Sequence, residues 1–158
     1  MVSLLTGLAL SSQAIAVDQS NDNLMCAVYM DVAVENLYPL GALPQDRAKQ
    51  MLLSRFTRLA AINMGTKEPV EDIVSDFISV RSQVRKDLVR SSGLDAMKLD
   101  SPAQISNYAK NLDAITTKHC TLSNRDLDKL MKTHTQDDFV KKAIEVSKEM
   151  GRQDKSES

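Results

Sequence analysis

Apolar residues recur every three or four positions along most of the chain, and this spacing predicts a succession of amphipathic helices. The clearest pattern covers residues 68–93, with acidic residues in its first turn and arginines in its later turns, as the helix dipole favours. Pro69 suits the first helical position and Gly93 suits the end. Its apolar stripe consists of Val70, Ile73, Val74, Phe77, Val80, Val84 and Leu88. We expect the other helices to pack around this one.

Three further stripes of the same period accompany this helix. They predict helices over residues 22–38, 44–65 and 101–120. Asn21 or Asp22 can cap the first of these helices. Proline or glycine marks each break between them, as expected where a helix starts or stops.

Two shorter amphipathic patterns follow, one from Ser123 and one from Thr135, and each opens with a weak capping box. In the second pattern Phe139, Val140, Ala143, Ile144 and Met150 line up on one side. This stripe either packs on the bundle or receives a partner helix. Packing is favoured; under the alternative, the partner-binding residues are Phe139, Val140 and Ile144.

The chain shows no signs of a β-sheet. It lacks runs of alternating β-branched and polar residues, and it has no Asn-Gly or Asp-Gly hairpin signal and no internal repeat. The predicted fold is therefore all-α: an antiparallel four-helix-type bundle with one or two additional C-terminal helices and one disulfide. The single helical domain covers residues 24–150, and residues 151–158 form a solvated tail.

Residues 1–16 read as a signal peptide, because they are apolar and end in Ala14-Ile15-Ala16, a small-residue pattern like a cleavage site. No Lys or Arg precedes Arg47, so the usual basic segment is missing, and the alternative is an ordinary buried N-terminal helix. The cysteine count favours export. We expect residues 17–23 to be a mobile N-terminus. The mature chain is expected to be periplasmic or secreted, without a membrane-spanning segment.

Cys26 and Cys120 are the only cysteines in the chain. Cys26 lies near the start of the first predicted mature helix, and Cys120 lies at the end of the fourth. In an up-down-up-down bundle these two helix ends lie at the same end of the molecule. The spacing therefore predicts a disulfide between them. The alternative is two free, buried cysteines in a cytosolic protein.

Composition argues against several function classes. The net charge is −1, there is no Trp, and no basic stripe is interleaved with aromatic residues, so nucleic-acid binding is not expected. Cysteine and histidine pairs with the spacing of a structural zinc site are missing. His119 lies beside Cys120, but a disulfide would remove the thiol that a Cys–His nucleophile needs. The acidic groups at 71–76 and 137–138 lie in first helical turns, where the helix dipole accounts for them.

The chain also lacks a glycine-rich phosphate loop and a nucleophile-elbow motif. We therefore expect no enzymatic activity and no catalytic, cofactor-binding or metal-binding residues. The favoured function is protein–protein binding in the cell envelope, as in toxin-immunity proteins, inhibitors or secretion-accessory proteins. This interpretation rests on architecture and compartment, because no motif of these classes is present.

The alternative is a carrier of haem or of another small ligand. Met25 or Met30 near the start of the first helix, with His119 near the end of the fourth, resembles the ligand placement of periplasmic b-type bundle cytochromes. The resemblance is confined to this spacing and implies a haem held within the bundle.

Overall fold

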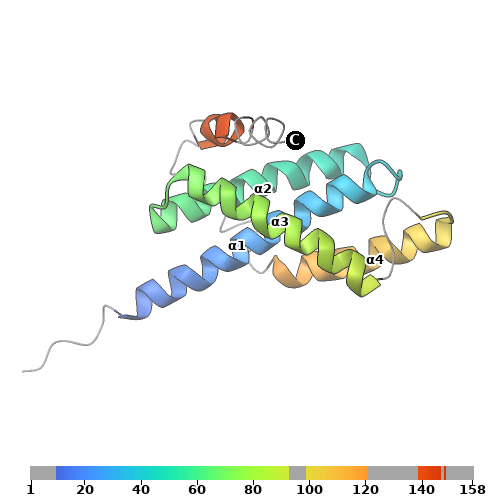
Figure 1. The fold of residues 1–158 in the computed structure, drawn as a ribbon, viewed down its shortest axis with the longest axis horizontal. Helices are drawn as coiled ribbons and strands as arrows, with labels where there is room; N and C mark the ends of the chain where they lie inside the picture. Colours follow the sequence, from blue (N-terminus) through green and yellow to red (C-terminus); the bar gives the residue numbers. More distant parts are fainter. Residues whose placement is uncertain (1–9, 93–98, 121–138, 147, 149–158) are drawn as a thin grey trace, which may run out of the picture.

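A computed structural model describes residues 10–92, 99–120, 139–146 and 148 of the chain (Figure 1). It contains the helices α1 (Leu10–Leu37), α2 (Gln45–Thr66), α3 (Val70–Ser92) and α4 (Pro102–His119), and residues 139–146 are also helical. The described residues include no strand. The prediction of an all-α bundle with additional C-terminal helix and a disulfide is confirmed.

α1 is the central helix of the bundle. It packs along α2, α3 and α4, whereas α2 and α3 touch only briefly. Buried residues cover more than one side of α1; they are Cys26, Ala27, Val28, Val32, Ala33 and Leu37. A helix covered on several sides is apolar around much of its circumference, so its amphipathic period is weak. The expectation that residues 68–93 organise the bundle is therefore wrong, because α3 owes its clear stripe to packing on one side.

α1 begins at Leu10, well before the predicted start near Asp22. Its first turns extend beyond the other helices (Figure 1), and Asn23 is the first α1 side chain that the structure shows as buried. Asn21 and Asp22 lie inside the helix and do not cap it. Residues 17–23 are helical, while the removal of residues 1–16 stays a prediction.

Local signals explain how the helices begin and end. Gly41, in the turn after α1, has a φ of 69°, a left-handed conformation that glycine adopts without steric cost. α2 ends at Thr66, just beyond the predicted Gly65, and Lys67 takes the left-handed capping position and donates its N–H to the Asn63 carbonyl. α4 begins as predicted, with the Ser101 hydroxyl accepting from the Gln104 N–H.

The disulfide between Cys26 and Cys120 is present, with the Cα atoms 4.8 Å apart and a separation of 94 positions along the sequence. The predicted pairing is confirmed. Its placement differs from the expectation, because Cys26 lies within α1 rather than at its start. The bond therefore joins the C-terminal cap of α4 to the central helix, at the level where α1 enters the bundle.

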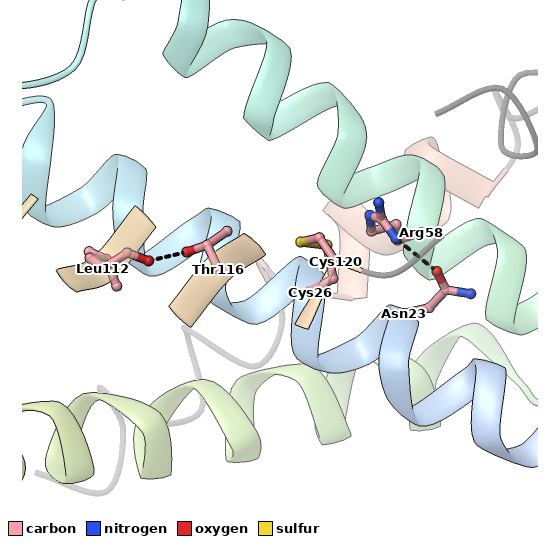
Figure 2. The surroundings of a disulfide bond; sticks show 6 residues. All are labelled: Asn23, Cys26, Arg58, Leu112, Thr116 and Cys120. Atoms are coloured by element: carbon pink, nitrogen blue, oxygen red, sulfur yellow. Dashed lines mark hydrogen bonds between the residues drawn. A yellow bond between two sulfur atoms is a disulfide. The ribbon is translucent and has the colours of Figure 1, made fainter. Parts of the chain in front are cut away.

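A buried arginine lies beside this bond (Figure 2). Arg58 of α2 is only 2% exposed, and its Nη1 donates to Oδ1 of Asn23 at 3.3 Å. Burial lowers the pKa of the Arg58 guanidinium, because the charged form loses its hydration. Asn23 is itself buried, so this polar pair joins α1 and α2 inside the core.

The helical residues 139–146 pack on the bundle. Phe139, Ala143 and Val146 are buried in the same core as the other helices. Outside the core, Lys142 Nζ lies 2.7 Å from Oε1 of Glu71, in the first turn of α3. Both contacts fix this C-terminal segment near the start of α3, as Figure 1 shows.

Phe139→Ala is expected to lower the free energy of unfolding by about 3 kcal/mol, because it removes a buried aromatic ring from the core. Ile144→Ala is expected to lower it by less than about 1 kcal/mol, since Ile144 is 40% exposed. Urea unfolding monitored by circular dichroism measures both. Equal losses for the two variants would contradict the observed packing of this segment.

Reduction of the Cys26–Cys120 bond is expected to lower stability by about 4 kcal/mol, because the bond closes a long loop and restricts the unfolded chain. Cys26→Ala and Cys120→Ala should show similar losses, since either change breaks the same bond. Urea unfolding with and without dithiothreitol gives the values, and the double Cys→Ala variant is the reductant-insensitive control. Labelling of both thiols in the native, air-exposed protein would contradict the expectation.

Candidate binding groove

The bundle is not closed on all sides. α3 and α4 both pack on α1, but they do not pack extensively on each other. An open groove with a volume of about 720 Å³ lies along α1 and α3. An open groove of this kind can accommodate part of another molecule.

The floor of the groove comes from Met25 and Tyr29 of α1, both half-buried. The Tyr29 ring stacks on the ring of His119, with the centroids 4.8 Å apart and the planes inclined by 10°. His119 is in the last turn of α4, so α4 contacts the floor of the groove through this stacked pair. Burial and, secondarily, the charge of Asp87 raise the pKa of Tyr29, so its hydroxyl stays neutral near pH 7 and can donate or accept a hydrogen bond.

The α3 side of the groove, its wall, extends around much of the circumference of that helix. Its apolar members are Ile78, Val80 and Val84. Its polar members are Ser79, Ser82, Gln83, Lys86 and Asp87. Val80 and Val84 belong to the stripe that α3 turns toward the core, and the polar members lie outside that stripe. The wall therefore offers both apolar contact and hydrogen-bonding groups.

The two charged side chains on this wall, Lys86 and Asp87, differ in whether they have partners. Gln83 Nε2 donates to Oδ1 of Asp87 at 3.0 Å, and Arg90 Nη1 lies 3.8 Å from the same oxygen. Lys86 is exposed and forms no ion pair within the described part of the chain. Among the described residues, Lys86 is thus a cation of the groove with no carboxylate at ion-pair distance.

A charged network on α1 fixes the position of α3, and with it the groove. Asp31, 5% exposed, pairs with Arg55 of α2 and with Arg81 of α3, whose Nε lies 2.6 Å from Oδ2 of Asp31. One turn later, Glu35 pairs with Arg81 at 3.2 Å and with Arg85. The sequence analysis assigned Arg81 and Arg85 to the helix dipole, and this was incomplete: both are ion-pair partners of α1.

Arg55 is also held by aromatic rings. Its guanidinium carbon lies 4.4 Å from the ring centroid of Phe56 and 5.9 Å from that of Phe77. These cation–π contacts orient the guanidinium toward Asp31. The sequence offered one signal of the network: Asp31 and Glu35, like Arg81 and Arg85, are four residues apart and so share a helix face.

The predicted partner-binding residues lie away from the groove's lining. Phe139 is buried in the core, Val140 packs against it, and Ile144 is exposed. Of the three, Ile144 is the exposed one. Their role in partner binding stays a prediction, and the packed arrangement is the one that the structure shows.

The predicted haem ligands are also placed. Met25 lines the groove, Met30 is half-buried, and one face of the His119 ring is covered by Tyr29. No cluster of three or more metal-ligating side chains occurs among the described residues. Cys120 is in the disulfide, so it offers no thiol to His119. The haem alternative stays a prediction.

The sequence did not predict the groove. The groove exists because α3 and α4 both pack on α1 without packing extensively on each other. The available signal was Ile78, an apolar residue outside the main stripe of α3 and 38% exposed. Val89, exposed and eleven residues later, lies on nearly the same helix face. Ile78 and Val89 thus place apolar surface on α3 outside its core stripe.

Comparisons with protein-family models, with curated proteins and with solved structures each found no match. None of the helices in the described ranges is both long and apolar enough to cross a membrane. Function must therefore be argued from the geometry of the bundle and its groove.

Asp31→Asn is expected to lower the free energy of unfolding by about 3 kcal/mol, because it leaves the guanidinium groups of Arg55 and Arg81 without their buried carboxylate. Glu35→Gln is the matched control: its carboxylate is 38% exposed, and the expected loss is below about 1 kcal/mol. Urea unfolding measures both variants. A loss at Asp31 no larger than that at Glu35 would contradict a structural role for the buried pair.

Proposed function

We propose that this chain is a small exported helical protein that acts by binding another protein through the groove between α1 and α3. The observation that carries the proposal is the open groove on one side of the bundle. Met25 and Tyr29 of α1 form its floor, and partly apolar residues of α3 line its side. An apolar floor with convergent polar groups around it is the usual composition of a recognition site.

The disulfide supports export. Disulfides form and persist in oxidising compartments and are rare in the cytosol. The bond between Cys26 and Cys120 closes a loop that spans most of the described domain. A periplasmic or secreted location fits this bond, and a toxin-immunity protein, an inhibitor or a secretion-accessory protein fits both location and size.

The openness of the groove favours a macromolecular partner over a small ligand. Small-molecule sites enclose most of the ligand surface, whereas this groove has α1 as a floor and α3 as a wall. Its exposed rim residue, Ile78, gains burial only if a partner surface covers it. The groove therefore suits a partner that brings its own second wall.

The test is site-specific photo-crosslinking in the native compartment. A photoreactive phenylalanine analogue at Ile78 is expected to crosslink to a partner protein. The same analogue at Leu53 of α2, which is 69% exposed, is the matched control for general surface contact. Mass spectrometry of the crosslinked product identifies the partner.

Equal crosslinking from positions 78 and 53, or none from position 78, would overturn the proposal. A Soret band in the protein purified from its native compartment would instead favour the haem-carrier alternative, with Met25 or Met30 and His119 as the residues to substitute first.

A further inference from the structure

The two halves of the disulfide lie in different surroundings. Cys26, within α1, has no exposed surface. Cys120, which follows the last residue of α4, is partly exposed. A thiolate that exchanges with a disulfide must reach one of its two sulfurs directly. Cys120 is therefore the half of this bond that an external thiol can approach while the bundle stays folded.

The choice of the attacked sulfur decides where negative charge develops. When a thiolate attacks Sγ of Cys120, a new S–S bond forms there and the bond to Cys26 breaks. The electron pair of the broken bond goes to Sγ of Cys26, which leaves as a thiolate. One disulfide replaces another, so the step consumes the thiol and needs no oxidant or reductant. The charge on Cys26 develops inside the core, where an uncompensated charge is costly.

Arg58 is placed to compensate this charge. It lies beside the disulfide in Figure 2, is 2% exposed, and its Nη1 donates to Oδ1 of Asn23 at 3.3 Å. The other two neighbours in this view, Leu112 and Thr116, are uncharged, and the Thr116 hydroxyl donates to the Leu112 carbonyl at 2.7 Å. Arginine remains charged in proteins, and a neighbouring arginine favours the thiolate form of a cysteine.

We propose that Cys120 is a site of reversible modification by a small thiol, in which Cys26 leaves as a thiolate that Arg58 stabilises. The reverse step has the same parts: the Cys26 thiolate attacks the mixed disulfide on Cys120 and restores the original bond. A small thiol suits the site better than a protein thiol, because Cys120 is only partly exposed. This inference is independent of the groove and of its partner.

The first test locates the adduct. The full, disulfide-bonded chain is incubated with glutathione, then unfolded in acidic urea that contains N-ethylmaleimide, and its peptides are analysed by mass spectrometry. The expected first product carries glutathione on Cys120 and maleimide on Cys26. Glutathione on Cys26, or equal amounts on both residues, would overturn the proposal, since attack on the unfolded chain has no reason to prefer one sulfur.

The second test measures the rate of adduct formation in variants of Arg58. Arg58→Met is expected to slow the reaction about threefold, because the leaving thiolate loses its stabilising charge. Arg58→Lys, which keeps the charge, is expected to keep the rate. Arg47→Met, an exposed change on α2 with the same effect on net charge, is the matched control and should also keep it. A merely structural role predicts the opposite sign, since a destabilised variant exposes the bond more often.

A second thiol separates an effect on the leaving sulfur from an effect on the reagent. Cysteamine carries a positive charge and glutathione a negative one, and both are expected to attack Cys120 and to react more slowly with Arg58→Met. Slowing with glutathione alone would mean that Arg58 attracts the reagent, and would overturn its assigned role. An unchanged or faster reaction of Arg58→Met would do the same. A rate that rises with low concentrations of urea would overturn attack on the folded chain.

Discussion

One helix that is covered from three directions determines the rest of this structure. α1 contacts α2, α3 and α4, so its side chains must satisfy three neighbours within a few turns. Small apolar residues such as Ala27 and Ala33 let the neighbouring helices approach closely. Asn23 and Asp31 are polar yet buried, and each is matched by an arginine of a neighbouring helix. Those pairings define register, because burying Arg58 or Asp31 away from its partner would be costly.

The sequence predicted the fold class, α2–α4 and the disulfide, because each depends on local or simple topological signals. Ser101 and Pro102 cap α4, the period of α3 follows from one-sided packing, and Cys26 and Cys120 have no other cysteine to pair with. The central position of α1 could not be predicted in the same way. Burial on several sides removes the contrast between apolar and polar faces on which periodicity depends.

The parts of the site that were missed have a common cause. The groove depends on which helices fail to meet, and the Asp31 network depends on which charged residues of different helices do meet. Both are relations between helices, and a single sequence shows mainly relations within them. Asp31 and Arg81 look like ordinary surface residues until α1 is placed between α2 and α3.

The disulfide has a consequence for how the groove would bind. His119, which supports the Tyr29 ring, immediately precedes Cys120, and Cys120 is bonded to Cys26, one position from Met25 in the floor. The bond therefore ties together the backbone segments that carry Met25, Tyr29 and His119, so this part of the floor has less conformational freedom to lose. Association costs less entropy when a binding surface is already ordered. The bond that stabilises the fold thus also preorganises the surface on which a partner would lie.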